Sequence, residues 1–464
     1  MKKNDIVTLD ITDLNSAGQG VARKDDMAVF VKHALPGESV VAHVMSVKKS
    51  YAFGKLIHII NTAEERIDPP CKIFGKCGGC DLQHLQYAAQ LAYKRKKVVD
   101  ALRRIGGIEC ETLSDTIGMD APFGYRNKAA FPVAEQNGRT VLGMYAERSH
   151  RVIPLSDCRI LLPNANRLLN VLSELIAPRR STALIQPYNE ETGKGILRHV
   201  MIRASHATGE MMICFVVNNF NNYRFPNEER LDMLKLMPNI KSIVLNSNVS
   251  PGNAIMGKHT KTLYGEDRIH EVIGGVRYAV SADAFFQINT AQTEKLYALV
   301  ADYAQLTGEE IIWDIYCGVG GIALYLARQC RYVIGVEINA QAVSDARHNA
   351  KINNITNVEF FAANAPSWIE QGMETRLSET PRNDYPAPDV IILDPPRKGC
   401  ERPLLDALLK IRPMKIIYVS CDPATLARDA RVLRDGGYTL RLAAPVDMFP
   451  QTCHIETAAL LQRQ

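Results

Sequence analysis

The 464-residue sequence has no stretch of about 18 consecutive apolar residues, the length that a membrane-spanning helix requires. Its start, Met1-Lys-Lys-Asn-Asp5, has neither the apolar run nor the small-residue cleavage site of a signal peptide. Internal repeats and low-complexity tracts are absent as well. These absences exclude the secreted and membrane-spanning classes and predict a cytoplasmic protein without a membrane partner.

Composition indicates a globular protein of several domains. Hydrophobic residues make up 46% of the chain and charged residues 23%, enough apolar material for packed cores. Its length predicts roughly two to four domains. The net charge of +5 is compatible with an RNA partner without requiring one. The basic cluster Lys94-Arg95-Lys96-Lys97 suits either RNA phosphates or a solvated helix face.

Three segments differ in their patterns. Residues 1–60 alternate polar and apolar side chains between glycine-containing turns, which predicts an OB-like β-barrel of the kind that binds nucleic acid. Residues 61–280 combine a cysteine-rich loop, a helical pattern ending at Gly106-Gly107 and strand-like runs, which predicts an α+β central domain. Residues 281–464 alternate apolar strands with helices. We therefore predict an α/β protein whose last domain is Rossmann-like, with ligands at the carboxyl ends of its parallel strands.

A glycine-rich turn follows the first strand of that predicted sheet. It reads Asp314-Ile-Tyr316-Cys-Gly318-Val-Gly320-Gly321, and its glycines let the backbone approach a ligand. Glu337, at the end of the next strand, is suitably placed to hold a ribose. The spacing is not the G-x-G-x-x-G of dinucleotide sites, and with Glu337 the turn resembles that of adenosylmethionine-binding methyltransferases. In that superfamily the position of Asn364 contacts adenine, although such an asparagine is also a common turn residue.

The next two strands end in residues that can carry chemistry. One ends in Asp394-Pro-Pro-Arg397; a related Pro-Pro-aromatic motif belongs to enzymes that methylate exocyclic amino groups, and the arginine argues against that reaction. The other ends in Ser420-Cys421-Asp422, which places a thiol in the expected pocket. Free cysteines are usually packing residues, but the position at a strand end favours a nucleophile.

A cysteine nucleophile suits methylation of a pyrimidine at carbon 5. Carbon 5 of uracil is a poor nucleophile, and thiolate addition at carbon 6 enriches it by forming an enolate. After methyl transfer, a base must remove the carbon 5 proton so that the thiol can leave. The segment His454-Ile-Glu456-Thr457 offers an imidazole and a carboxylate. We assign the base to Glu456 and keep His454 as the alternative.

Together these motifs resemble the RNA uracil-5-methyltransferases, which include bacterial rRNA and tRNA enzymes, over essentially the whole chain. The resemblance rests on Phe285-Phe-Gln287-Ile-Asn289, Asp314-x-Tyr316-Cys-Gly, Asp394-Pro-Pro-Arg, Ser420-Cys421-x-Pro-x-Thr-x-x-Arg-Asp429 and His454-x-Glu456-Thr457. It implies Cys421 as nucleophile and Glu456 as base. The cofactor and uridine pocket that it implies contains Gln287, Tyr316, Glu337 and Asp394. Two positions depart from the family's pattern: Asp422 replaces an asparagine, and Gln451 replaces a histidine.

Cysteines form a separate candidate site. Cys71, Cys77 and Cys80 lie in Cys-x5-Cys-Gly-Gly-Cys, a strong metal-binding signal for which zinc and an iron-sulfur cluster are the chemical alternatives. The family resemblance adds Cys158 as the last ligand and implies a [4Fe-4S] cluster with a structural or RNA-positioning role. The Cys-x3-Cys-x2-Cys spacing of radical enzymes is absent from this loop, so we do not expect radical chemistry.

The resemblance also indicates the substrate. Residues 1–60 are similar to a TRAM domain through Gly18-Gln-Gly20, Val29-Phe-Val31 and Pro36-Gly37-Glu38, and a TRAM domain with a cluster is more typical of the rRNA enzymes. We therefore expect a monomer that uses S-adenosyl-L-methionine to methylate a flipped or single-stranded uridine of 23S rRNA, with no DNA partner. The alternatives are a tRNA uracil-5-methyltransferase, cytosine-5 methylation, and a non-catalytic RNA-binding ribosome assembly factor.

Overall fold

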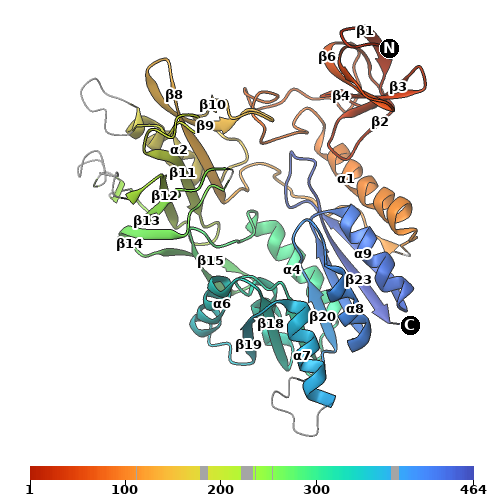
Figure 1. The fold of residues 1–464 in the computed structure, drawn as a ribbon, viewed down its shortest axis with the longest axis vertical. Coiled ribbons are helices and arrows are strands. Elements are labelled where there is room, and N and C mark those ends of the chain that lie inside the picture. The colour runs from red at the N-terminus through yellow and green to blue at the C-terminus, as the bar shows by residue number, and fades with distance from the viewer. Residues whose placement is uncertain are drawn as a thin grey trace.

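The structure, a computed structural model, describes residues 1–464 except 111, 178–185, 221–231, 233, 236, 253, 378–385 and 464. The described residues form a barrel at the N-terminus, a central sheet and a larger C-terminal sheet, and the C-terminus lies at the end of a strand in that last sheet (Figure 1). In this part of the chain no helix is long and apolar enough to cross a membrane.

The N-terminal segment folds as a small β-barrel in the order β1-β5-β6-β4-β3-β2. Its alternating pattern explains the fold, because Val29, Val31 and Ala52 point inward and are fully buried while their neighbours in sequence face outward. The strands are β1 (Ile6–Asp10), β2 (Asp13–Leu14), β3 (Gly20–Lys24), β4 (Met27–Lys32), β5 (Ser39–Val47) and β6 (Tyr51–Asn61).

The central domain is a mixed sheet whose order is β10-β9-β8-β11-β12-β13-β14, with α2 (Pro163–Ile176) packed on it. Strands β11 and β12 are buried along their whole length, as expected for the middle of a covered sheet. The strands are β8 (Lys128–Gln136), β9 (Arg139–Tyr145), β10 (Val152–Pro154), β11 (Leu197–Ala204), β12 (Met211–Val217), β13 (Ile240–Ser247) and β14 (His259–Gly265). The hairpin β15 (Arg268–Ile273) and β16 (Val276–Ser281) leads to the C-terminal sheet.

The C-terminal sheet has the order β19-β18-β17-β20-β21-β23-β22-β7. Its first five strands are parallel, which confirms the predicted doubly wound sheet, whereas β23 runs antiparallel to both β21 and β22. The strands are β17 (Ile311–Ile315), β18 (Tyr332–Glu337), β19 (Val358–Ala362), β20 (Val390–Leu393), β21 (Lys415–Ser420), β22 (Tyr438–Val446), β23 (Glu456–Arg463) and the short β7 (Thr112–Leu113).

Helices cover both faces of this sheet. The helices are α1 (Tyr87–Ala101), α4 (Thr290–Ala304), α5 (Gly321–Leu326), α6 (Ala340–Ile352), α7 (Ala365–Leu377), α8 (Arg402–Ile411) and α9 (Pro423–Asp435), with short turns η1 (Leu102–Gly106) and η3 (Ala327–Gln329). Alternate strand residues point to opposite cores: Ile312 packs with α4, α5 and α6, whereas Trp313 packs with α7, α8 and α9. Helix α1 lies beside α9 (Figure 1), and its Val98 belongs to the second core.

Candidate active site

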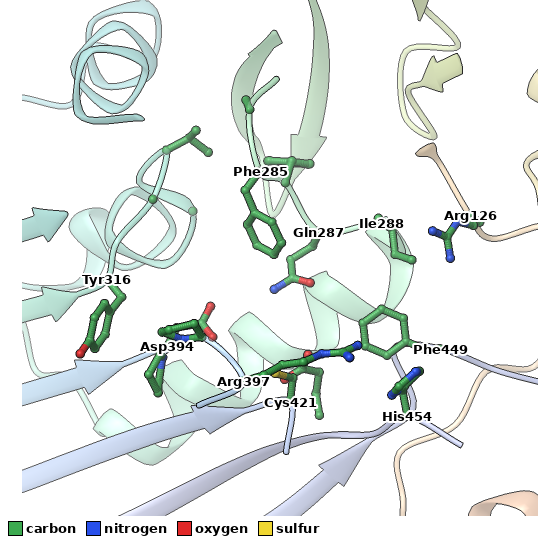
Figure 2. A pocket seen from close by; sticks show the side chains of 18 of the residues that line it. Arg126, Phe285, Gln287, Ile288, Tyr316, Asp394, Arg397, Cys421, Phe449 and His454 are labelled. Carbon is green, nitrogen blue, oxygen red and sulfur yellow. The ribbon is translucent and has the colours of Figure 1, made fainter. Parts of the chain in front are cut away.

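A cavity of about 1040 Å³ lies at the carboxyl ends of the parallel strands. The turn after β17, the end of β18 and the segments after β20 and β21 form one side of it. The other side reaches the cysteine loop and Gln287, which leads into α4. Figure 2 shows Gln287, Arg397 and Cys421 around this space. The structure therefore brings the predicted site residues to the edge of the sheet where a ligand was expected.

The turn after β17 presents backbone to the cavity. Tyr316 and Gly320 both have positive φ angles, 69° and 80°. The N–H of Tyr316 donates to the carbonyl of Val336 at 2.9 Å, which holds this strained residue in place. A Cβ at Gly320 would approach Phe360 to 2.9 Å, so a larger side chain does not fit there. Glycine is thus required both by the turn and by the neighbouring ring.

Three carboxyl groups surround the same part of the cavity. Asp314 is 1% exposed; its Oδ2 accepts the N–H of Ala323 at 3.0 Å, and its Oδ1 has no partner among the described residues. Burial, with the nearby Asp394 carboxyl, raises the pKa of Asp314 to about 8, and desolvation raises the pKa of Asp394 to about 7. Glu337 accepts backbone N–H bonds at 3.3 and 2.8 Å. A positively charged ligand would favour the ionised forms of Asp314 and Asp394.

Asn364 directly precedes α7 and also lines the cavity. Its Oδ1 accepts bonds from the N–H of Ser367 at 3.4 Å and from the Ser367 hydroxyl at 3.2 Å. Asn364 therefore caps the helix, which matches the turn-residue alternative. Its contact to an adenine stays a prediction.

Cys421 and Glu456 are brought together by strand pairing. Ser420 of β21 is the register partner of Thr457 of β23, so Cys421 and Glu456 lie opposite each other at the ends of these two strands. Both side chains line the cavity. Burial and the Glu456 carboxyl raise the pKa of Cys421 to about 11. The Cys421 side chain is therefore a thiol at neutral pH, and positive charge nearby would favour its ionisation.

Arg397 supplies positive charge at this point. Arg397 lines the same cavity as Cys421, and in Figure 2 its side chain extends toward Phe449. Its charge lowers the pKa of Cys421 and of Glu456, opposing the effect of burial on both groups. Burial nevertheless holds the pKa of Glu456, which is 5% exposed, well above the usual carboxyl value.

His454 lies in the same cavity as Glu456. Its ring packs edge-on against Phe449, with 6.1 Å between the ring centroids, and burial lowers its pKa. The imidazole is therefore predominantly neutral at neutral pH.

The four predicted cysteine ligands line the far end of the cavity together. Burial, reinforced by the thiols of the other three cysteines, raises the pKa of Cys80 to about 12. The N–H of Gly79 points at the sulfur of Cys77 at 3.4 Å. Among the described residues, however, no three Cys, His, Asp or Glu side chains are placed to hold a single metal ion. The four predicted ligands thus line one cavity, and their binding of a metal or cluster stays a prediction.

Comparisons with known proteins identify the family. A family model described as tRNA (Uracil-5-)-methyltransferase matches residues 253–464, and a TRAM domain model matches residues 2–57. The chain is 44% identical over 468 residues to an uncharacterized RNA methyltransferase of Halalkalibacterium halodurans, covering 100% of this chain and 98% of the relative. It is 42% identical over 467 residues to one of Listeria monocytogenes, with 99% and 98% covered.

The chain belongs to the RNA uracil-5-methyltransferase family. A solved structure, the Pyrococcus abyssi tRNA (uracil-54, C5)-methyltransferase in complex with S-adenosyl-L-homocysteine, is 27% identical with a TM-score of 0.77. The match covers 98% of this chain and 100% of that one. The family, the methyltransferase fold and the N-terminal TRAM domain predicted from the sequence are confirmed.

The cavity of this RNA uracil-5-methyltransferase also contains residues that sequence patterns did not assign. Asp314, Arg397, Arg126 and Phe449 line it, although none was proposed as a site residue. The sequence could have indicated Asp314 and Arg397 as site residues, because both belong to motifs at the ends of predicted strands. Arg126 comes from a loop of the central domain, and no local pattern marked it.

Proposed function

We propose that the protein methylates carbon 5 of uridine in RNA, with Cys421 as nucleophile, Glu456 as base and S-adenosyl-L-methionine as methyl donor. The observation that carries the proposal is the placement of Cys421 opposite Glu456 in a cavity that also contains Asp314 and Asp394. A non-catalytic assembly factor would need neither the thiol nor the carboxyl at this position.

The residues around the turn after β17 fit the methyl donor. The unpartnered Oδ1 of Asp314 and the carboxyl of Asp394 suit a cationic ligand, and Glu337 at the end of β18 suits ribose hydroxyls. Tyr316, with Asn364 beyond β19, would complete the site. When bound, the donor supplies an electrophilic methyl group on a positively charged sulfur. The S-adenosyl-L-homocysteine in the Pyrococcus abyssi structure, which is the donor without its methyl group, supports the same choice.

In the proposed reaction the Cys421 thiolate adds to carbon 6 of uracil, and the electron pair moves to carbon 5 as an enolate. Gln287 would orient the uracil by hydrogen bonding, and Arg397 would stabilise the thiolate. Carbon 5 would form a bond to the methyl group as the methyl–sulfur bond of the donor breaks and S-adenosyl-L-homocysteine is left, and Glu456 would then remove the carbon 5 proton. The electrons of that C–H bond restore the C5–C6 double bond, and the thiolate leaves carbon 6.

We propose 23S rRNA as the substrate and tRNA as the second candidate. The TRAM domain together with the cysteine loop favours rRNA. The similarity to a tRNA enzyme over 98% of the chain is the specific observation in favour of tRNA.

We also propose that Cys71, Cys77, Cys80 and Cys158 hold a [4Fe-4S] cluster. These four thiols line the same cavity, and a [4Fe-4S] cluster takes one thiolate at each of its four irons. Bound there, the cluster would tie the loop carrying three of the ligands to the central domain.

The test is to incubate the protein with methyl-labelled S-adenosyl-L-methionine and unmodified rRNA or tRNA, with Cys421→Ala as the inactive control. We expect labelled 5-methyluridine in 23S rRNA. Label in tRNA alone would favour the second candidate. Label on cytidine, or on no RNA, would overturn the proposed reaction, and the latter result with retained RNA binding would favour an assembly factor.

A further inference from the structure

Glu456 follows a loop that is mostly buried. Residues 447–455 connect β22 to β23, and Glu456, the first residue of β23, is the register partner of Val446. Asp447 is fully buried, and Gln451 is 2% exposed. The conformation of this loop, together with the pairing of β23, therefore sets the position of the carboxyl group that we propose as the base.

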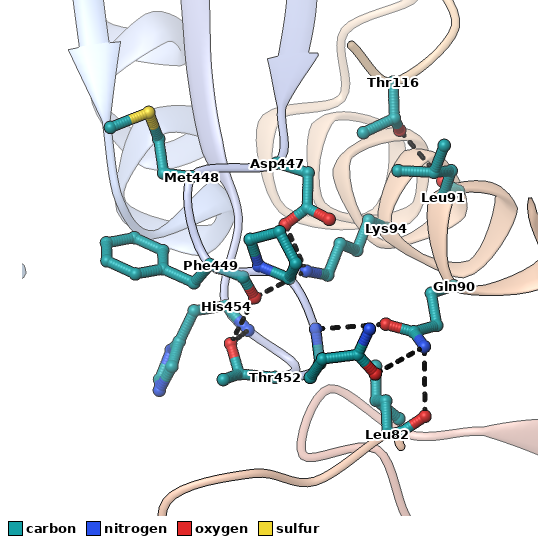
Figure 3. A network of polar contacts seen from close by, with 12 residues as sticks. Leu82, Gln90, Leu91, Lys94, Thr116, Asp447, Met448, Phe449, Thr452 and His454 are labelled. Carbon is teal, nitrogen blue, oxygen red and sulfur yellow. Dashed lines mark hydrogen bonds and ion pairs between the residues drawn. The ribbon is translucent and has the colours of Figure 1, made fainter. Parts of the chain in front are cut away.

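Helix α1 binds the start of the loop through a buried ion pair (Figure 3). The Lys94 ammonium donates to Asp447 at 2.5 Å and to the carbonyl of Phe449 at 3.1 Å. The Tyr87 hydroxyl donates to the other oxygen of Asp447 at 2.9 Å. The side chains of Lys94 and Asp447 are both inaccessible to solvent. Replacing a buried pair of this kind by apolar residues of similar volume often costs a fold no stability, whereas removing one partner leaves an uncompensated buried charge.

A pair of amides binds the middle of the loop. Gln90 on α1 donates to the side-chain carbonyl of Gln451 at 3.1 Å and accepts the backbone N–H of Gln451 at 3.2 Å. Gln451 has a φ of 71°, a left-handed conformation that a glutamine rarely adopts without such support. Its carbonyl accepts the N–H groups of Asp81 and Leu82, at 2.9 and 3.0 Å, directly after the cysteine loop.

We propose that Lys94 and Gln90 are positioning residues that act through Asp447 and Gln451 to hold Glu456 in place for proton removal from carbon 5. The inference rests on the proposed function, because it assigns these residues to the step that Glu456 performs. Neither Lys94 nor Gln90 lines the cavity, so neither touches the nucleotide or the methyl donor there. A small displacement of a base is enough to slow its reaction, since catalysis depends on sub-ångström placement.

The test compares three variants. Lys94→Met removes the ammonium and leaves Asp447 without its cationic partner. If that variant fails to fold, the double variant Lys94→Met with Asp447→Asn takes its place, because it leaves no unpaired charge. Gln451→Gly removes the amide but tolerates the left-handed backbone. We expect kcat to fall about 10- to 100-fold. The affinity for S-adenosyl-L-methionine, the kcat/KM for RNA and the rate of adduct formation should each stay within about twofold of wild type, since a displaced base slows only a step after methyl transfer.

The decisive readout is a methylated protein–RNA adduct, seen on denaturing gels and by mass spectrometry. It should accumulate in the variants because proton removal comes after methyl transfer. Asp100→Asn is the matched control: it breaks the exposed pair with Lys96 on the same helix and should release product like wild type. Loss of donor affinity, or wild-type turnover in a folded variant, would overturn the positioning role. Absence of 5-methyluridine with wild-type protein would instead overturn the proposed function.

Discussion

Cys421 and Glu456 lie opposite each other because β21 and β23 run antiparallel, with Ser420 paired to Thr457. In a doubly wound sheet made only of parallel strands, the residues at the carboxyl end of each strand are followed by a helix, and no strand begins at that edge. Here β23 begins at the point where β21 ends, so its first side chain faces the thiol. The antiparallel strand thus supplies the second functional group of the site.

Variants of these two residues should stop the reaction at different points. Cys421→Ala should abolish both turnover and covalent attachment to RNA, because no thiolate can add to carbon 6. Glu456→Gln should still form the adduct and transfer the methyl group, but elimination should stall and a methylated adduct should accumulate. Mass spectrometry of the linked peptide identifies the attachment site. Attachment through Cys317 or Cys453 would contradict the assignment, and rapid turnover of Glu456→Gln would move the base role to His454 or water.

Arg397→Met should make Cys421 harder to ionise. The guanidinium lowers the pKa of Cys421, so its removal leaves burial and Glu456 to raise that pKa further. We expect iodoacetamide to label Cys421 several-fold more slowly at pH 9, measured by mass spectrometry of the Cys421 peptide. Lys398→Met is the control, since this neighbouring lysine pairs with Glu401 at 2.7 Å. Equal labelling rates in the two variants would show that Arg397 does not act on the thiol.

Donor binding should strengthen as pH rises. Folded-state pKa values of about 8 for Asp314 and about 7 for Asp394 lie above the usual carboxyl range, so both groups are largely protonated at pH 6. Because the folded protein holds these protons more tightly than the unfolded chain does, their contribution to stability is greatest at low pH and is lost as pH rises from the ordinary carboxyl pKa to about 8. The sulfonium of S-adenosyl-L-methionine favours the ionised groups, whereas the sulfur of S-adenosyl-L-homocysteine is uncharged.

Calorimetry at pH 6 and pH 8.5 checks this prediction. The affinity for S-adenosyl-L-methionine should rise several-fold more than the affinity for S-adenosyl-L-homocysteine. Asp314→Asn should remove most of the difference, because asparagine cannot ionise. The same pH dependence for both ligands would place the sulfonium away from Asp314 and Asp394.

The sequence could predict the groups at strand ends but not the residues that hold them. Cys421 and Glu337 follow apolar strand runs, and parallel strands bring such ends to one edge. Lys94 shows the limit: its cluster suited a solvated face or phosphates, and the structure instead buries it against Asp447. That reading of Lys94 was wrong because the partner is 353 positions away and no periodicity reports a contact at this distance. For the same reason Arg126 could not be assigned to the cavity.

The cysteine site gives the last prediction. Anaerobically purified protein should contain iron and acid-labile sulfide in equal amounts, because four thiols around one end of the cavity suit a [4Fe-4S] cluster. Burial and the neighbouring thiols raise the pKa of Cys80 to about 12, so an empty site holds protons that the cluster must displace, and loading should be favoured at higher pH.

Cys77→Ser should remove the iron and sulfide and lower the melting temperature of the protein. The free energy of unfolding should fall by about 2 to 5 kcal/mol, the cost of losing a structural cross-link. Cys110→Ser is the control, since this half-buried cysteine lies beside β7 and outside the cavity. Iron and sulfide assays with differential scanning calorimetry provide the measurement. Stoichiometric zinc without sulfide would contradict the cluster while leaving the four ligands in place. An unchanged iron content in Cys77→Ser would instead show that the Cys77 thiol is not a ligand. A cluster reaches full occupancy only when all of its thiolate ligands are present.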